Sequence, residues 1–365
     1  MGKALTIAYF ANANWVHGQR FAQFFADRGH RVVFISFKAA VLPKIEVHVL
    51  RPSGYGVIDW FTTTHLAHRL IERIKPDLVH YHFAPSFACI AANLNFHPSI
   101  ITVHGTDVLS SPTDLRFSPI YTLPLMPFVI SAMHKAELVT SVAGHLTGIM
   151  RAYGVPSHRI ATFQYGVDLD RFNCTSKAEG SDIVLSTRNY FNYYRLDVLI
   201  KAAAKVLAVR PDITFLLAGE GPQRGKLERS IARLGLSERC LLLGKLTSEA
   251  ILELCGRSAV YASPSAIDGT SLSLLEAMAT GLYPVVSDIA ANRFWIKDGE
   301  GGTLVRTDSP ADWAKAIIDA LDDQDRRKKA VLLNRARVEQ QANWRNNMLR
   351  MEEIYYQLVE TRSSQ

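Results

Sequence analysis

The sequence lacks the features that mark membrane-spanning, disulfide-rich and zinc-binding proteins. Its 365 residues contain no apolar run of the roughly 18 residues that a membrane-spanning helix needs. Only four cysteines occur, at Cys89, Cys174, Cys240 and Cys255, and no two of them form a C-x-x-C pair. Cysteines scattered in this way indicate neither a disulfide framework nor a metal site. We therefore expect a cytoplasmic protein that holds no metal.

Dense positive charge is also missing. The chain has 41 Lys and Arg against 34 Asp and Glu, a net charge of +7, without a basic block or a zinc-finger or RNA-binding motif. This excess is too small and too dispersed to indicate a nucleic-acid partner. It suits an anionic small substrate, and it leaves peripheral contact with the inner face of a membrane open.

Two further absences narrow the chemistry. No histidine follows His158, so any histidine chemistry belongs to the first half of the chain. No G-x-G-x-x-G string follows the first expected strand, Leu5 to Phe10. A dinucleotide-dependent oxidoreductase is therefore disfavoured, because that string is where such enzymes bind the pyrophosphate.

Apolar strands alternate with helical segments through most of the chain, which predicts an α/β fold with parallel sheets. A length of 365 residues favours two domains. We expect an N-terminal domain at 1–172, a polar linker at 173–182, a second domain at 183–340 and a final helical segment at 341–365.

The most informative stretch is Asp268–Asp288. An expected buried strand, Ala259 to Ser263, leads through a loop of small residues into a helix that begins near Leu272. A helix N-terminus at the carboxyl end of a strand offers free backbone N–H groups to an anion. Asp268 and Glu276 frame that site. Amides suit a diphosphate and carboxylates suit sugar hydroxyls, so the stretch favours a nucleotide sugar over the alternative of an ordinary buried helix with a capping Asp.

At these residues the chain resembles the retaining family 4 glycosyltransferases of the GT-B fold, also described as glycosyl transferases group 1. Their acidic pair is E-x7-E; Asp268 and Glu276 keep that spacing, with the first Glu shortened to Asp. The strings Leu-Glu-Ala-Met-Ala at 275–279 and Gly-Leu-Tyr-Pro-Val-Val-Ser-Asp at 281–288 follow as in the family. The resemblance extends over nearly the whole chain. It implies two Rossmann-like domains that face each other across a cleft, with the C-terminal helix returning to the first domain.

The resemblance also implies a donor site in the second domain. Arg188 matches the arginine of the family's diphosphate clamp, but the lysine that follows it in the family is missing. Tyrosines occupy the neighbourhood of that position, and Arg195 is the nearest cation. Either Arg195 or a tyrosine replaces the lysine, or backbone amides hold the phosphates. The remaining implied donor-binding residues are Gly219 and Gly221 of a G-x-G-P turn, Lys245 beside the base, Gly269, Thr270, Ser271 and Leu272 at the helix start, and Glu276 at the ribose.

In the first domain, His104 ends an apolar strand in the string His-Gly-Thr-Asp, similar to the family's T-x-H-G-x-D. The resemblance implies that His104 contacts the transferred sugar near the leaving phosphate and places Asp107 beside it, with a helix cap as the alternative for Asp107. The first loop carries Asn14, His17, Gly18 and Arg20, which face the phosphates or the acceptor in this interpretation; a solvated loop is the alternative.

Three other patterns have structural alternatives. His80 and His82 fall on one face of an expected strand, but no third metal ligand is apparent. The D-x-D string Asp168 to Asp170 is expected to be structural. The apolar segment Leu123–Ile130 predicts a buried helix, or else an interfacial patch for a lipid-linked acceptor.

Together these features favour a metal-independent, retaining transfer of a sugar from a nucleotide-diphosphate sugar, with UDP the family's commoner choice. The acceptor would be a hydroxyl of a glycan, a glycolipid or a small molecule, and no cofactor is implied. The catalytic candidates are His104, Asp268 and Arg188. A nucleotide-sugar epimerase of the same fold and a catalytically inactive sugar-nucleotide-binding protein are the rival interpretations.

Overall fold

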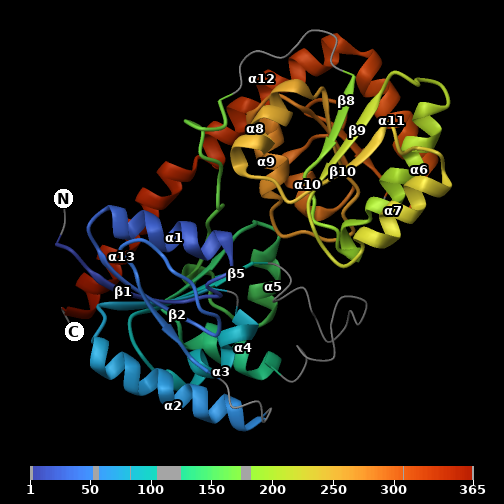
Figure 1. The fold of residues 1–365 in the computed structure, drawn as a ribbon. Coiled ribbons are helices and arrows are strands. Elements are labelled where there is room, and N and C mark those ends of the chain that lie inside the picture. Colours follow the sequence, from blue (N-terminus) through green and yellow to red (C-terminus); the bar gives the residue numbers. More distant parts are fainter. Residues whose placement is uncertain are drawn as a thin grey trace. The chain divides into compact units, whose positions relative to one another are not determined.

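The computed structural model describes residues 3–51, 57–82, 84–104, 125–173, 182–306 and 308–363. The chain forms two compact units (Figure 1): residues 1–165 with 345–365, and residues 166–344. Residues 166–172, which the sequence places with the first domain, and residues 341–344 therefore belong to the second unit.

The first unit is built on a parallel sheet in the order β3-β2-β1-β4-β5-β6-β7. Its strands are β1 (Thr6–Phe10), β2 (Arg31–Ser36), β3 (Glu46–Val49), β4 (Leu78–His82), β5 (Ser99–Val103), β6 (Leu138–Ser141) and β7 (Ile160–Thr162). The central strands β4 and β5 are buried along their whole length. Both faces of the sheet are covered by helices, which is why these strands read as near-continuous apolar runs.

The helices that cover this sheet are α1 (Val16–Asp27), α2 (Val57–Ile74), α3 (Ala84–Leu94), α4 (Met126–Lys135) and α5 (Leu146–Ala152). The apolar segment Leu123–Ile130 forms a helix from Met126 onward, with Val129 and Met133 buried, as expected for the helical alternative. Residues 123 and 124 lie outside the described residues. Helix α3 was not anticipated from the sequence.

The last helix, α13 (Trp344–Ser363), belongs to the first unit from residue 345 onward. Tyr355 is fully buried, and its phenol bonds the phenol of Tyr9 on β1 at 2.5 Å. Glu352 accepts two hydrogen bonds from Arg28, at 2.6 and 2.7 Å. Burial alone would raise the pKa of Glu352, but the bonds from Arg28 and His30 lower it. The expected return of the C-terminal helix to the first domain is thus confirmed.

The second unit has a parallel sheet in the order β10-β9-β8-β11-β12-β13. Its strands are β8 (Ile183–Ser186), β9 (Thr214–Ala218), β10 (Cys240–Gly244), β11 (Val260–Ser263), β12 (Tyr283–Ser287) and β13 (Thr303–Val305). Its helices are α6 (Leu196–Leu207), α7 (Arg224–Arg233), α8 (Ser248–Arg257), α9 (Leu272–Ala279), α10 (Ala290–Trp295), α11 (Pro310–Asp322) and α12 (Gln324–Gln341). The strand order reverses between β8 and β11, which pair with each other. The topological switch point of the sheet therefore lies between these two central strands.

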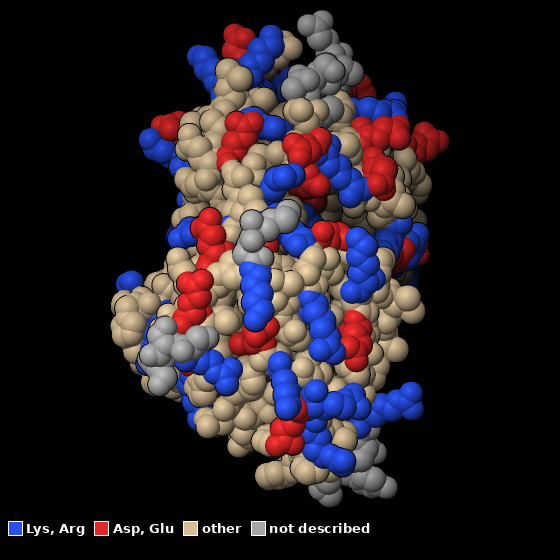
Figure 2. Space-filling model, turned by 90° about the vertical axis from the view of Figure 1, so that its left-hand side faces the viewer, with Lys and Arg blue, Asp and Glu red and all other residues tan. Residues whose placement is uncertain are grey.

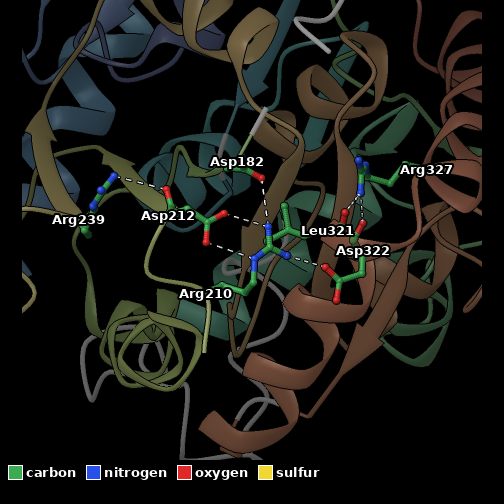
Figure 3. Close-up of polar contacts among 8 residues, drawn as sticks. Asp182, Arg210, Asp212, Arg239, Leu321, Asp322 and Arg327 are labelled. Carbon is green, nitrogen blue, oxygen red and sulfur yellow. Dashed lines mark hydrogen bonds and ion pairs between the residues drawn. The ribbon is translucent and has the colours of Figure 1, made fainter. Parts of the chain in front are cut away.

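A charged network fastens the amino-terminal edge of this second sheet (Figure 3). Arg210 donates to Asp322 at the end of α11 at 2.6 Å, to Asp212 before β9 at 3.0 Å, and to Asp182 before β8 at 3.4 Å. Arg327 donates to the carbonyl oxygen of Ala320 at 2.5 Å, near the C-terminus of α11. These contacts join the starts of two strands to the end of a helix. They lie at the amino-terminal edge of the sheet, whereas ligands bind beside the carboxyl ends of parallel strands.

The surface carries both signs of charge. Figure 2 shows Lys and Arg side chains interspersed with Asp and Glu over one face of the molecule. Within the described part of the chain, every helix is too short or too polar to cross a membrane.

Candidate active site

Two of the expected site residues lie at the switch point of the second sheet. Arg188 follows the carboxyl end of β8, and Asp268 follows the carboxyl end of β11. In open parallel sheets ligands bind beside the carboxyl ends of the strands at the point where the strand order reverses. The fold therefore places these two side chains at the position where a ligand is expected.

Arg188 and Asp268 form a buried ion pair. The Nη2 atom of Arg188 lies 2.5 Å from Oδ2 of Asp268, and the two side chains are only 6% and 14% exposed. The Nη1 atom donates to Oγ of Ser271 at 2.6 Å. The ring of Tyr194 covers the guanidinium, whose carbon lies 3.9 Å from the ring centroid. In the described part of the chain Arg188 Nε is buried without a hydrogen-bond partner.

The arginine stays charged in this setting. Burial alone would lower the pKa of Arg188, but the negative charge of Asp268 and the hydrogen bond between them raise it above its ordinary value. Tyr194 and Tyr261 add to the same rise. A desolvated guanidinium with an unused donor is well suited to bind an anionic oxygen.

Ser271 joins this ion pair to helix α9. It is the N-cap of the helix, and its hydroxyl accepts a hydrogen bond from the amide of Leu274 at 3.2 Å. The same hydroxyl accepts from Arg188, so the guanidinium is fixed against the N-terminus of α9. The expected anion-binding residues Gly269, Thr270, Ser271 and Leu272 are at this helix start, and Glu276 lies partly buried on its second turn.

Gly219 and Gly221 shape the loop that carries Arg188. A Cβ atom on Gly219 would lie 2.4 Å from the carbonyl oxygen of Arg188, and one on Gly221 would lie 2.6 Å from that of Tyr190. Both glycines have positive φ, 158° and 155°. The close approach that they permit is therefore between the G-x-G-P turn and the Arg188 loop. Their expected contact with the donor stays a prediction.

Among the described residues, neither of the two other expected cations of this domain bonds Arg188 or Asp268. Arg195 adopts the left-handed conformation, φ 53°, and its Nε lies 3.9 Å from Asp197 in the first turn of α6. Lys245 is exposed directly after β10. Their donor-binding roles stay predictions. Tyr194, one of the tyrosines near the position of the missing lysine, covers the face of the Arg188 guanidinium.

In the first unit, His104 follows the carboxyl end of β5 and is partly buried. The phenol of Tyr165 contacts its ring at Nδ1 and lies 3.0 Å from Nε2. The ring of Trp15 packs against it at a centroid distance of 4.6 Å. Neither aromatic residue was singled out from the sequence, because both contacts join segments that are distant along the chain.

The remaining candidates of the first unit have different surroundings. Asn14 is exposed, and its amide bonds the side chain of Asn12 at 3.1 Å. Gly18 is buried where α1 approaches β1, since a Cβ there would lie 3.2 Å from Ala11. Arg20 is partly buried. The side chain of His17 and all of Asp107 lie outside the described residues.

His80 and His82 are fully buried and their rings stack at 4.1 Å. His80 bonds Tyr355 and Thr102, each at 2.6 Å, which is the environment of a structural histidine. No group of three His, Cys, Asp or Glu side chains that could hold a metal occurs in the part of the chain that the structure describes. Asp168 accepts from the amide of Arg171 at 3.3 Å and closes a local turn, in line with a structural D-x-D string.

Comparison with known proteins adds to this geometry. The family model "Glycosyl transferases group 1" matches residues 170–337, and "Glycosyl transferase 4-like" matches residues 6–142. The D-inositol 3-phosphate glycosyltransferase of Nocardia farcinica is 29% identical over 53% of this chain and 46% of its own length. The phosphatidyl-myo-inositol mannosyltransferase of Mycobacterium tuberculosis is 28% identical over 67% of this chain and 63% of its own length. The chain thus matches about half to somewhat under two thirds of these relatives.

Solved structures share the fold. A sucrose-phosphate synthase from Thermosynechococcus elongatus superposes with a TM-score of 0.83 at 17% identity, covering 98% of this chain and 100% of that one. HepE from Anabaena, in complex with UDP and glucose, gives a TM-score of 0.78 at 17% identity and covers 97% of this chain and 100% of that one. The structural likenesses show that the chain has the GT-B fold. The two matched family models, one in each unit, show that it belongs to the group 1 glycosyltransferases.

Proposed function

We propose that this protein transfers a sugar from a nucleotide-diphosphate sugar to a hydroxyl of a glycan, a glycolipid or a small molecule. The transfer retains the anomeric configuration and needs no metal. The observation that carries this proposal is the cluster of Arg188, Asp268 and Ser271 at the switch point of the second sheet. It combines a permanent positive charge, a helix N-terminus and a carboxylate in a nearly dry site.

Arg188 and the N-terminus of α9 are suited to the donor diphosphate. The buried Nε of Arg188 gains an acceptor when a phosphate oxygen binds, which removes the penalty of about 1–3 kcal/mol for an unpaired buried donor. Glycosyl transfer builds negative charge on the leaving diphosphate. Fixed positive groups that face this developing charge lower the barrier, because they need no reorganisation during the reaction.

The ion pair also suggests how Asp268 is used. Without a donor, its carboxylate neutralises Arg188 at 2.5 Å. When the diphosphate takes over that charge, Asp268 becomes available to accept hydrogen bonds from hydroxyls of the transferred sugar. Ser271 and Tyr194 keep the guanidinium in place during this exchange, since both contact it independently of Asp268.

The finer assignments extend this scheme. Glu276 accepts hydrogen bonds from the ribose, and the nucleotide is UDP, as in the HepE complexes. His104 in the first unit contacts the transferred sugar near the leaving phosphate. The two curated relatives are named for inositol-containing acceptors, which supports a hydroxyl acceptor. A lipid-linked acceptor would bring this protein into peripheral contact with the inner face of a membrane.

The first experiment screens the purified full chain for thermal stabilisation by UDP-, GDP- and ADP-sugars, because a ligand bound by the folded state raises its melting temperature. Release of nucleoside diphosphate is then followed with candidate acceptors, with and without EDTA, and the product anomer is assigned by NMR. We expect EDTA-resistant release of UDP and a product with the donor's configuration. An inverted product or loss of activity in EDTA would overturn these details. Tight nucleotide binding without transfer to any acceptor would indicate a binding protein.

A second measurement tests the ribose contact by calorimetry. Glu276→Ala should weaken UDP binding by at least about tenfold, since hydrogen bonds to a carboxylate contribute about 1.5–3 kcal/mol. The matched control is Glu253→Ala, which removes an exposed carboxylate from α8 of the same unit. Unchanged UDP affinity in the Glu276 variant would refute the assignment.

A further inference from the structure

Tyr165 bonds His104 within the first unit. Its phenol oxygen contacts Nδ1 of the imidazole and lies 3.0 Å from Nε2. The side chain of Tyr165 is buried, and its ring packs edge-on against Phe21 at a centroid distance of 5.5 Å. Trp15 lies against the same imidazole. The histidine ring therefore has a packing partner and a hydrogen-bonding partner, and these come from different segments.

The backbone around Tyr165 is anchored on both sides. The carbonyl oxygen of Gln164 accepts a hydrogen bond from Asn347 of α13 at 2.9 Å. Gly166, the first residue of the second unit, fits so closely that a Cβ there would lie 2.6 Å from the carbonyl oxygen of Ala342. A side chain on such a fixed backbone can hold a partner in one orientation.

We propose that Tyr165 is a positioning residue for His104. Its phenol contacts the edge of the imidazole that carries both ring nitrogens, and so it determines the orientation of the ring. Because the phenol lies closer to Nδ1 and the bond made by one ring nitrogen sets the protonation of the other, it also favours one tautomer. This inference rests on the proposed function, in which His104 contacts the transferred sugar. It adds a residue at the point where the chain passes from one unit to the other.

The decisive experiment is a double-mutant cycle in the full chain. We expect Tyr165→Phe, which keeps the ring against Phe21, to lower kcat roughly tenfold, the loss typical of one well-placed hydrogen bond. The KM for the donor should change by less than about twofold, since the phenol does not bind the nucleotide. In a His104→Ala background, Tyr165→Phe should change kcat by less than about twofold, because its effect passes through the missing imidazole.

Tyr355→Phe is the matched control. It also removes a buried phenol oxygen from the first unit, but that oxygen bonds Tyr9 and His80. We expect its kcat to stay within about twofold of the native value, even if its melting temperature falls. An equal loss of kcat in this variant would overturn the specific role of Tyr165, as would additive losses in the double mutant.

A second readout is independent of activity. The NMR chemical shifts of the imidazole nitrogens of His104 are recorded without any substrate. Their signals are identified among those of the 12 histidines because they are absent in His104→Ala. We expect Tyr165→Phe to change the tautomer ratio of His104 and Tyr355→Phe to leave it unchanged. Unchanged His104 shifts in Tyr165→Phe would refute the proposal. A changed tautomer in a protein that transfers no sugar would refute the proposed function alone.

Discussion

The two units hold their candidate residues in different ways. In the second unit, Arg188 bonds both Asp268 and Ser271 in a buried cluster that contains full charges. In the first unit, His104 contacts the aromatic side chains of Trp15 and Tyr165. One site is organised by electrostatics and helix capping, the other by ring packing and a phenol.

Histidine distribution sharpens the contrast. All 12 histidines precede residue 159, so the second unit contains none. In the first unit, burial, with the charges of His82 and His104, lowers the pKa of His80 well below its ordinary value of 6.5. The difference teaches that the second unit offers the permanent charge of an arginine to an anionic donor, while the candidate histidine of the first unit is held by aromatic packing.

The largest effect is expected from Arg188→Ala. Removing the guanidinium takes away the charge that would stabilise the leaving diphosphate, so turnover should fall by about 10²–10³. It also leaves Asp268 with little solvent and without its partner, which should lower the free energy of unfolding by about 3–5 kcal/mol. Chemical denaturation and product release measure the two effects separately.

Arg293→Ala is the control for that variant, because Arg293 makes two hydrogen bonds to Asp288, at 2.6 and 2.9 Å, on the surface of the same unit. Its loss should change the free energy of unfolding by no more than about 1 kcal/mol. Full activity of the Arg188 variant would refute the clamp. Equal stability losses in the two variants would refute the contrast between a buried and an exposed ion pair.

Gly219→Ala tests whether the electrostatic site depends on the backbone beneath it. The added Cβ would meet the carbonyl oxygen of Arg188 at 2.4 Å, so the Arg188 loop must shift. We expect a loss of about 1–3 kcal/mol in the free energy of unfolding and weaker nucleotide binding. Gly148→Ala is the control in helix α5, where a Cβ meets nothing within 4 Å. It should be neutral or slightly stabilising; native nucleotide affinity of Gly219→Ala would contradict the supporting role.

The sequence predicts the electrostatic site better than the aromatic one. Arg188 and Asp268 follow two apolar strands, and once those strands are adjacent in a parallel sheet their carboxyl ends meet. The aromatic contacts join residues that are far apart in the sequence, so no local sequence pattern reveals them. Tyr165 and His104 are 61 positions apart. Among the tyrosines after Arg188, the turn Asn192–Tyr194 and the left-handed Arg195 determine which ring faces the guanidinium.

Helix α3 was missed for a related reason. The sequence predicts the strand that carries His80 and His82, but it does not predict the helix Ala84–Leu94 that follows, with Pro85 in its first turn. The segment is apolar on most of its circumference and packs between α2, α4 and the sheet. A helix buried on several sides lacks the polar face whose periodicity identifies it in a sequence.

A change of pH should affect the stability of the two units differently. His80 is neutral when folded, and its folded pKa lies well below 6.5. Below pH 6.5 the unfolded chain therefore binds a proton that the folded chain does not. The contribution of neutral His80 to the free energy of unfolding is fully present above pH 6.5. It falls as the pH drops toward the folded pKa, by up to about 1.4 kcal/mol per pH unit. Hydrogen exchange at pH 7.5 and 5.5, corrected for intrinsic rates, should show reduced protection of β4 and β5 and little change in β8 and β11.

His80→Gln should remove most of the pH dependence of protection in β4 and β5. His158→Gln, at an exposed position, should preserve it. The second unit serves as an internal reference, since it has no histidine that could respond in this range. An equal loss of protection in both sheets would mean that the two units respond to acid together, and it would remove this difference between them.

The smallest effect concerns Tyr194, where aromatic packing enters the electrostatic site itself. Its ring centroid lies 3.9 Å from the guanidinium carbon of Arg188. Tyr194→Leu should lower turnover by about three- to tenfold, because a cation–π contact contributes roughly 0.5–2 kcal/mol. Tyr194→Phe keeps the ring and should stay within about twofold of the native rate. If the Phe variant instead loses as much as the Leu variant, the phenol is the active element and the residue acts as a donor to the diphosphate. The two variants therefore decide whether this tyrosine orients Arg188 or takes over hydrogen bonding from the lysine that the sequence lacks.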